Sequence, residues 1–326
     1  MADNTGMKFC QDIYNHWVEA GHEVKFERGT SEYLAQWADI YYIDWWDGNL
    51  NYLWKLYNGV EGVSRTPDWN NDKKPKVIVR AIDWDVWCSY VPQSKEYTDF
   101  VDKAICIAPH MEKRLRENGD FGSPGEAGDK LKLIIPGVNL DKFPLKTTKT
   151  DGFQVGMVLG DMWWYKNHMG GLDIFRILAK SDPRWHLHIR GQHEPGQYNP
   201  VMYEHYIESR QLKDRVTLWG SFGEMNEFYE KLDYLLHPGM KESFCYAVAE
   251  AMCKGIKPVV NHFYGACADI PDQENIWGHW MLYDDHSEAV KMFDGDIEPE
   301  KYRNIIKEHY PLDRMLKEID EWIGIA

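Results

Sequence analysis

Two carboxylates, Glu242 and Glu250, lie in one segment whose pattern predicts an α-helix. The segment from His237 to Val260 reads HPGMKESFCYAVAEAMCKGIKPVV. Ser243 suits the N-cap of this helix, and Gly255 suits the left-handed position that ends one. We therefore expect Glu242 at the mouth of the helix and Glu250 about two turns further in, at about 1.5 Å of rise per residue.

Such a helix start can hold a sugar attached to a phosphate. The free N–H groups after Ser243 and the positive end of the helix dipole attract a diphosphate, whereas carboxylates accept hydrogen bonds from hydroxyl groups. For an arbitrary pair of glutamates, a buried helix whose first acid complements the dipole is the more common explanation. Here the apolar runs Asp233 to His237 and Lys257 to Val260 read as strands, so the helix is the crossover of a βαβ unit. This context favours the functional interpretation.

The glutamate pair and its flanking strands resemble the Glu-x7-Glu signature of retaining glycosyltransferases of the GT-B fold, in the group that includes relatives of glycogen synthase and sucrose synthase. The resemblance covers roughly residues 75 to 270. Four other stretches are similar to the family: CIAPHMEKRL over Cys106 to Leu115, IPGVNLDKF over Ile135 to Phe143, Val155 to Lys166, and Val216 to Gly220. The resemblance implies transfer of a sugar from a nucleotide-sugar donor, expected to be a UDP- or GDP-sugar, to the hydroxyl group of a glycan or small molecule.

The resemblance also assigns the donor-binding residues. Glu250 would accept hydrogen bonds from the ribose and Glu242 from the transferred sugar. Backbone amides of Ser243, Phe244 and Cys245 would hold the edges of the sugar and the phosphate. No cofactor is expected beyond this co-substrate.

A cation near the leaving diphosphate would lower the barrier, because negative charge grows there as the bond breaks. Lys166 in DMWWYKN is similar to the family's phosphate-binding lysine, and Gly160 precedes it at the end of a strand. The family usually carries an arginine where this chain has Asp161. Arg190 in HIRGQ ends the next strand and is expected to reach the same place, since parallel strand ends converge. A solvated lysine and a structural arginine are the competing explanations.

The acceptor side is expected in the first domain. Its candidates follow a predicted strand or open a predicted helix, and Asp83 is also a catalytic candidate: Arg80, Asp83, Asp85 and His110. Trp84 and Trp87 could stack on a ring. Ordinary surface charge, packed indoles and a structural role for His110 are equally compatible with the sequence.

Retention in this family is usually explained without a protein nucleophile, by front-face attack in which the departing phosphate takes the acceptor's proton. Hydrolysis by paired carboxylates is less compatible, because Glu242 and Glu250 share one helix start, whereas a hydrolase needs acids on opposite sides of a bond.

The resemblance implies no metal. His186 and His188, with His193 nearby, leave a metal cluster as an alternative, although strand alternation gives this spacing by chance.

Short strands alternate with helices throughout, which predicts parallel sheets and two Rossmann-like domains with a cleft between them. Ten strands are predicted: Glu23 to Phe26, Ile40 to Ile43, Val77 to Arg80, Ala104 to Ile107, Leu131 to Ile135, Val155 to Leu159, His186 to Arg190, Val216 to Leu218, Tyr234 to His237 and Pro258 to Asn261. With a linker at Lys146 to Gly152, the acceptor domain spans residues 1–148 and the donor domain residues 149–300. Residues 301–326 are expected to form a helix that crosses back to the first domain.

The start of the chain departs from the family, which opens with a strand and a glycine-rich loop. The sequence MADNTGMKFCQDIYNHW reads as the tail of that loop followed directly by its helix. We therefore expect the first-domain sheet to lack its first strand, which would leave the acceptor side near Asn4 to Gly6 less enclosed.

The bulk composition argues against a membrane-spanning protein, a secreted protein and a protein that binds nucleic acid nonspecifically. No apolar run approaches the roughly 18 residues of a membrane span, and no secretory signal pattern is present, so we expect a cytoplasmic protein with its six cysteines reduced. The net charge of −15 opposes nonspecific binding to nucleic acid.

Two alternatives remain open. A hydroxymethylated base in DNA could be the acceptor, as in compact viral members of the fold, with Lys73, Lys74, Lys76 and Arg80 as a local basic track. Alternatively, Asp161 at the arginine position and the missing strand would fit an inactive module that only binds a nucleotide-sugar.

Overall fold

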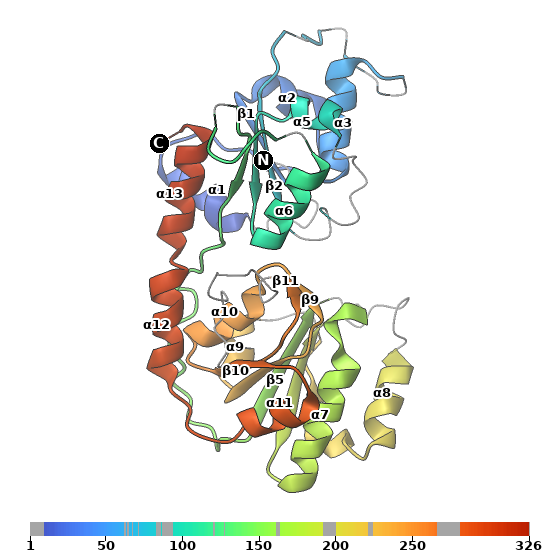
Figure 1. Ribbon diagram of the computed structural model, residues 1–326, viewed down its shortest axis with the longest axis vertical. Coiled ribbons are helices and arrows are strands. Elements are labelled where there is room, and N and C mark those ends of the chain that lie inside the picture. The colour runs from blue at the N-terminus through green and yellow to red at the C-terminus, as the bar shows by residue number, and fades with distance from the viewer. Residues whose placement is uncertain are drawn as a thin grey trace. The chain divides into compact units, whose positions relative to one another are not determined.

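The computed structural model describes residues 10–61, 63, 65–66, 68–70, 72–82, 86, 94–119, 121–126, 128–160, 164–191, 200–220, 224–265 and 281–325. The chain divides into two compact units (Figure 1). The first combines residues 1–137 with 313–326, and the second comprises residues 138–312. The sequence-based boundaries at residues 148 and 300 both fall inside the second unit. Among the described helices, none is both long and apolar enough to span a bilayer.

The first unit is built on a four-stranded parallel sheet in the order β1-β2-β3-β4. Its strands are β1 (Ile40–Asp44), β2 (Lys76–Ala81), β3 (Lys103–Cys106) and β4 (Leu131–Leu133). All but the first residue of β1, β2 and β3 are buried, as expected for a parallel sheet covered on both faces. The helices are α1 (Gln11–Glu19), α2 (Glu32–Trp37), α3 (Gly48–Asn58), α5 (Lys95–Phe100) and α6 (Pro109–Asn118).

The last helix, α13 (Leu312–Ile323), packs on the first unit. Asp320 accepts hydrogen bonds from the indole of Trp17 at 2.8 Å and contacts His16 at 2.6 Å. The indole of Trp322 donates to the carbonyl of Ala104 at 3.1 Å. These contacts join the end of the chain to α1 and β3.

The single helix expected over residues 301–326 is divided into two helices. Helix α12 (Pro299–His309) ends before Tyr310, and α13 begins after Pro311. Proline lacks the N–H group that a helix interior needs, which explains the break.

The second unit contains a six-stranded parallel sheet in the order β12-β10-β8-β5-β6-β7. Its strands are β5 (Gln154–Gly160), β6 (His186–Gly191), β7 (Val216–Leu218), β8 (Tyr234–His237), β10 (Lys257–Asn261) and β12 (Leu282–Tyr283). The helices are the short η1 (Trp164–Lys166) and η2 (Lys213–Arg215), α7 (His168–Ser181), α8 (Pro200–Ser209), α9 (Met225–Tyr229), α10 (Tyr246–Cys253), α11 (His286–Met292) and α12. Two short strands, β9 (Lys241–Glu242) and β11 (Tyr264–Gly265), pair beside the main sheet.

The order of this sheet reverses beside β5. The chain runs from β5 outward through β6 and β7, and then returns to place β8, β10 and β12 on the other side of β5. Ligands of open α/β sheets bind outside the carboxyl ends of the strands at such a reversal. The topology therefore points to the ends of β5 and β8.

Nine of the ten predicted strands are confirmed, with ends within two residues of those expected. The strand predicted over Glu23 to Phe26 is wrong, because these residues have no regular structure. The expected loss of a first strand concerns residues 1–9, which lie outside the described residues.

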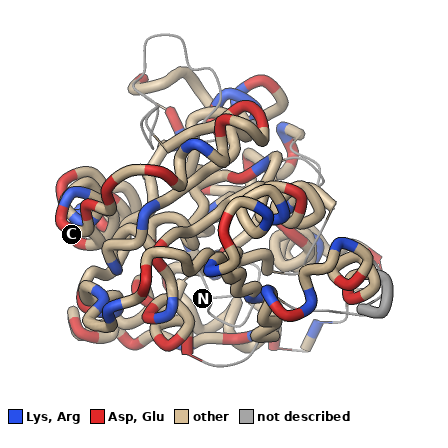
Figure 2. The backbone as a smooth tube through the Cα atoms, turned by 90° about the horizontal axis from the view of Figure 1, so that it is seen from below, with Lys and Arg blue, Asp and Glu red and all other residues tan. Residues whose placement is uncertain are grey.

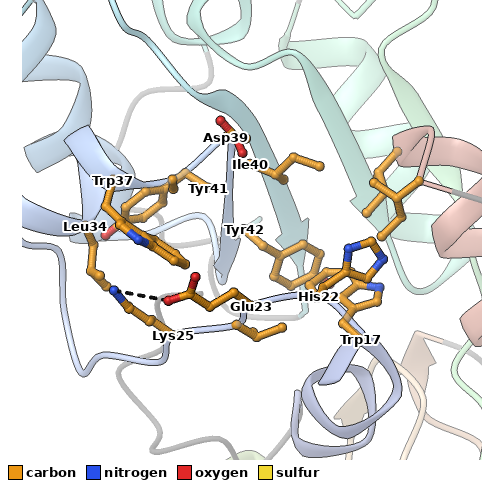
Figure 3. A pocket seen from close by; sticks show the side chains of 14 residues that line it. Trp17, His22, Glu23, Lys25, Leu34, Trp37, Asp39, Ile40, Tyr41 and Tyr42 are labelled. Atoms are coloured by element: carbon orange, nitrogen blue, oxygen red, sulfur yellow. Dashed lines mark ion pairs between the residues drawn. The ribbon is translucent and has the colours of Figure 1, made fainter. Parts of the chain in front are cut away.

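A cavity of about 320 Å³ lies between this segment and β1. Residues 22–25 line one side of the cavity and residues 39–42 the other, so the cavity separates the segment from β1 (Figure 3). The ammonium of Lys25 lies 3.9 Å from the ring centroid of Trp37 and 3.6 Å from a carboxylate oxygen of Glu23. The lining includes none of the site residues predicted from the sequence.

Candidate functional site

Lys166 and Glu242 form an ion pair beyond the carboxyl ends of β5 and β8. Lys166 ends η1, which follows β5, and Glu242 ends β9, which follows β8. The Lys166 ammonium donates to a carboxylate oxygen of Glu242. Their side chains are 19% and 11% exposed, so the pair lies mostly inside the protein yet can be reached. The two residues lie 76 positions apart, and the sheet topology brings them together.

Backbone contacts hold the two segments side by side. The N–H of Met240 donates to the carbonyl of Tyr165 at 2.7 Å, and the side-chain amide of Asn167 donates to the carbonyl of Pro238 at 3.1 Å. Asn167 has a φ of +49°, a left-handed conformation that asparagine tolerates better than most residues. At Gly171 in α7, a Cβ would lie 3.0 Å from Pro238, so this close approach depends on glycine.

Burial and charge act in opposite directions on the pair. Burial alone would lower the pKa of Lys166, but the charge and hydrogen bond of Glu242 outweigh it and raise that pKa above its ordinary value. Burial alone would raise the pKa of Glu242, but the charge of Lys166 lowers it. Both groups are therefore ionised at neutral pH.

His237 and Cys245 complete a buried cluster around Glu242. Burial lowers the pKa of His237 to about 4, so the imidazole is neutral at pH 7. His237 Nε2 lies 3.5 Å from a carboxylate oxygen of Glu242. The sulfur of Cys245 lies 3.6 Å from both ring nitrogens of His237.

These three side chains place possible metal-ligand atoms within 4.8 Å of one another. A sulfur that is equally distant from both imidazole nitrogens is not aligned with the lone pair of either. The carboxylate of Glu242 is also already occupied by an ammonium. The cluster fits a metal ion only if Lys166 withdraws and His237 reorients.

The predicted histidine pair on β6 is arranged as a hydrogen-bonded network. The indole of Trp219 donates to His188 Nδ1 at 3.2 Å, so Nε2 carries the proton and donates to Gln154 at 3.0 Å. His186 Nε2 contacts the hydroxyl of Thr217 at 2.8 Å. Both nitrogens of His188 are thus engaged by protein groups, while His193 lies outside the described residues.

The predicted start of the glutamate-bearing helix is wrong. Ser243 is not the N-cap: α10 begins at Tyr246, and Cys245 is the N-cap in a left-handed conformation with φ +64° and ψ 70°. The reason is that β9 pairs with β11 through Glu242, which keeps the chain extended to that residue. The predicted helix end is confirmed, since Gly255 follows the last turn with a φ of +77°.

Glu250 lies within α10 and has a partner that the sequence did not predict. The buried phenol of Tyr229 in α9 donates to its carboxylate at 2.8 Å. Burial, followed by the negative charge of Glu250, raises the pKa of Tyr229 well above its ordinary value. Tyr229 therefore stays protonated and fixes the direction of Glu250.

Gly160 and Arg190 lie at the same edge of the sheet as η1. Gly160 ends β5 with a φ of +55° and pairs with Gly191, while Arg190 pairs with Val158. The side chain of Arg190 is buried, with the residue 5% exposed. The placement on neighbouring strand ends is as expected, and a meeting of Arg190 with Lys166 stays a prediction.

The acceptor-side candidates are only partly described. Asp83 and Asp85 lie outside the described residues, as do Trp84 and Trp87. His110 lies in the first turn of α6, directly after Pro109.

Arg80 makes a bidentate ion pair with Asp44, at 2.6 and 2.9 Å, in which both side chains are almost fully buried. The pair connects the carboxyl ends of β1 and β2. This partner was not foreseen from the sequence. It gives the guanidinium a structural role at the sheet edge.

The region that contains the ion pair matches a known protein family in sequence. Residues 141–289 match the family of glycosyl transferases group 1. The match covers a little less than half of the chain and contains Lys166, Glu242 and Glu250. No curated protein matches the chain.

Solved structures share the fold at low sequence identity. A glycosyltransferase from Rickettsia africae ESF-5 is 13% identical with a TM-score of 0.66, covering 100% of this chain and 96% of that one. Anabaena Alr3699/HepE in complex with UDP and glucose is 14% identical with a TM-score of 0.64, covering 96% and 89%. A variant of S. aureus TarM, in complex with fondaparinux, alpha-GlcNAc-glycerol and UDP, is 15% identical with a TM-score of 0.61, covering 78% and 52%.

This chain thus spans about half the length of the TarM structure. The likenesses confirm the predicted α/β fold with parallel sheets, as found in GT-B glycosyltransferases. The expected cleft between the domains stays a prediction.

Proposed function

We propose that this protein is a glycosyltransferase that moves a sugar from a nucleotide-sugar donor to a hydroxyl acceptor with retention of configuration. The Lys166–Glu242 ion pair at the strand-order reversal carries the proposal. It lies inside the region that matches glycosyl transferases group 1. UDP in the HepE and TarM structures supports a UDP-sugar as the donor.

In this proposal the donor exchanges partners with the ion pair. The diphosphate takes the Lys166 ammonium, and its negative charge replaces that of Glu242, which raises the pKa of Lys166 in the absence of the donor. The released carboxylate of Glu242 then accepts a hydrogen bond from a hydroxyl of the transferred sugar. Each new contact replaces an existing one, so binding leaves neither buried charge without a partner.

The chemical step follows from the same placement. The bond between the anomeric carbon and the phosphate oxygen breaks, and the acceptor oxygen bonds to that carbon from the same face. The acceptor proton passes to the leaving phosphate oxygen, so no protein base is required. Lys166 stabilises the charge that grows on the leaving group, the role that a divalent cation fills in other transferases. On this basis we propose that the reaction proceeds without a metal.

Glu250 would hold the ribose of the donor. Its carboxylate is fixed by Tyr229 at one oxygen, about one turn of helix beyond the start of α10. A rigid acceptor at this point selects donors that carry ribose hydroxyls. Gly160, Arg190 and the backbone amides of Ser243, Phe244 and Cys245 complete the proposed donor site.

No observation favours DNA as the acceptor. Every cation of the expected basic track already contacts a group within the first unit. Lys74 pairs with Asp102 at 2.7 Å, Arg80 is buried in its own ion pair, and Lys73 and Lys76 donate to backbone carbonyls. Lys and Arg positions are interspersed with Asp and Glu positions over the described residues seen in Figure 2. We therefore propose a glycan or small molecule as the acceptor.

Nucleotide release tests the proposal. The protein is incubated with UDP-glucose, UDP-N-acetylglucosamine or GDP-mannose, and release of UDP or GDP is measured with and without saccharide acceptors. We expect release with one donor, and a loss of about 100-fold in Lys166→Met, the size typical of removing one charge-stabilising group. Lys180→Met, which changes an exposed lysine of α7, is the matched control and should keep full activity.

Binding measurements separate the enzyme from an inactive module. A protein that binds UDP tightly yet releases nothing from any donor would be such a module. A protein that neither binds UDP nor releases nucleotide would refute the proposal, as would a Glu242→Gln variant with unchanged activity.

A further inference from the structure

The two segments that carry the ion pair also expose apolar surface. Among the described residues, five large hydrophobic side chains are well exposed: Val18, Tyr33, Trp164, Ile177 and Met240. Two of the five, Trp164 and Met240, each lie two residues before a member of the ion pair. Trp164 is 59% exposed and Met240 is 39% exposed.

The exposed indole of Trp164 contacts the ring of its neighbour Tyr165. It lies in η1, and its ring meets that of Tyr165 edge to face at 6.0 Å. Tyr165 is buried and receives a backbone hydrogen bond from Met240 at 2.7 Å, while the Lys166 ammonium lies 5.3 Å from its ring centroid. Tyr165 is therefore the residue of η1 that packs into the protein interior, whereas most of the indole of Trp164 is exposed.

The order of groups along the site indicates what this surface contacts. Glu250 lies deepest, within α10, and Glu242 lies before the start of that helix. Met240 lies two residues before Glu242, and its N–H bonds to Tyr165, the neighbour of Trp164, so both exposed side chains lie on the segments that carry the ion pair rather than on α10. A donor whose ribose reaches Glu250 and whose sugar reaches Glu242 places the next ring, that of the acceptor, beside Trp164.

We propose that Trp164, flanked by Met240, binds a pyranose ring of a saccharide acceptor by stacking. This inference rests on the proposed function, because the assignment of Glu250 to the ribose and Glu242 to the sugar decides which end of the donor lies near Trp164. The C–H groups on one face of a pyranose carry partial positive charge, and the π face of an indole is negative. An open-chain polyol offers no such face, so the surface selects a ring.

Acceptor binding tests the inference without requiring turnover. Wild-type protein saturated with UDP is titrated calorimetrically with cellotetraose, maltotetraose and triacetylchitotriose, and with glycerol as the acceptor that lacks a ring. We expect one of the three saccharides to bind, and its Kd to rise roughly tenfold or more in Trp164→Ala, which corresponds to about 1.4 kcal/mol. Trp164→Phe, which keeps a π face, should recover most of the affinity.

Two controls keep this result separate from the donor site. Ile177→Ala changes another exposed hydrophobic side chain of the second unit and should leave saccharide affinity unchanged. The Kd for UDP should be the same in wild type and Trp164→Ala. Unchanged saccharide affinity in Trp164→Ala, or failure of all three saccharides to bind wild type, would overturn the inference even if UDP binds. Failure of UDP to bind would instead count against the proposed function.

Discussion

Lys166 and Glu242 neutralise each other within the protein, which makes each a ready partner for a ligand that supplies both an anion and a hydroxyl group. Neighbouring residues preserve this state. His237 is neutral, so it adds no competing positive charge near Glu242 at pH 7. The protonated phenol of Tyr229 fixes the carboxylate of Glu250 by donating a hydrogen bond to it. At the scale of residues, Glu242 and Glu250 are acceptors held by protein partners, and Lys166 is a cation held by Glu242.

Cys245 provides a direct test of backbone strain in the site. A left-handed conformation costs a residue with a side chain roughly 1–2 kcal/mol more than glycine. Cys245→Gly and Cys245→Ala both remove the thiol, but only glycine relieves the strain. We expect Cys245→Gly to be more stable than Cys245→Ala by about 1 kcal/mol in urea unfolding.

Cys253 is the matched position for this comparison, because it is the last residue of α10 and has helical geometry. There the order should invert, with the alanine variant more stable than the glycine variant by about 1 kcal/mol. The same order at both positions would contradict the strain at Cys245.

His237, which is buried, and His188, which is half-buried, predict how stability depends on pH. Burial lowers the pKa of His237 and that of His188 to about 4. The unfolded chain binds these protons at a pKa of about 6.5, whereas the native state does not. The free energy of unfolding should therefore fall as pH decreases from about 6.5 towards 4, by at most about 1.4 kcal/mol per pH unit for each histidine.

Urea unfolding at several pH values measures this slope. His188→Gln removes one of the two groups and should reduce it. A slope equal to that of the wild type would show that His188 titrates normally in the native state.

At the scale of elements, strand ends and helix ends position the site. The Asp44–Arg80 pair joins the carboxyl ends of β1 and β2 in a buried environment. Removing one partner of a buried pair costs about 3–5 kcal/mol, because the other charge remains buried without a partner. We expect this loss in Asp44→Ala, measured by thermal or urea unfolding.

The double variant Asp44→Leu with Arg80→Met distinguishes a structural role from acceptor binding. It removes both charges and should recover much of the lost stability. If Arg80 also contacts the acceptor, this variant would be stable yet have a raised KM for the acceptor.

The end of α10 depends on Gly255. A Cβ there would lie 2.6 Å from Pro299, at a φ of +77°. Strain and the close contact together should cost Gly255→Ala about 2–4 kcal/mol. Gly295, with a φ of +86° and open space around it, isolates the backbone term, so Gly295→Ala should lose only about 1 kcal/mol. Equal losses at the two positions would show that Pro299 yields.

Elements were predicted far better than contacts. Strands such as Tyr234–His237 are continuous apolar runs between turn signals, which sequence reasoning detects directly. The spacing of Glu242 and Lys166 relative to such strands then placed both at one sheet edge. Their ion pair, the Tyr229–Glu250 bond and the Arg80–Asp44 pair depend on the order of strands within a sheet, which local patterns do not encode. The start of α10 was misplaced because the pairing of β9 with β11 overrides the preference of Ser243 for an N-cap.

At the scale of the whole molecule, two compact units predict two responses to ligand. Every group of the proposed donor site lies within residues 138–312. UDP at a hundredfold excess over its Kd should stabilise that unit by about 2.7 kcal/mol. Calorimetry should show one transition that moves with UDP and one that does not.

Removing α13 tests which transition belongs to which unit. Truncation after Pro311 deletes Asp320 and Trp322, which contact α1 and β3 of the first unit. The transition that is insensitive to UDP should fall in temperature while the other stays in place. The reverse outcome would show that α13 supports the second unit.

The position of α13 also sets an order of events during synthesis. The first unit takes its final helix from residues that are translated after the entire second unit. While the chain leaves the ribosome, residues 138–312 can complete their core, but the amino-terminal unit must wait for residues 313–326. The half of the protein that is made first is therefore the half that finishes folding last, and its unfinished surface is what chaperones would meet.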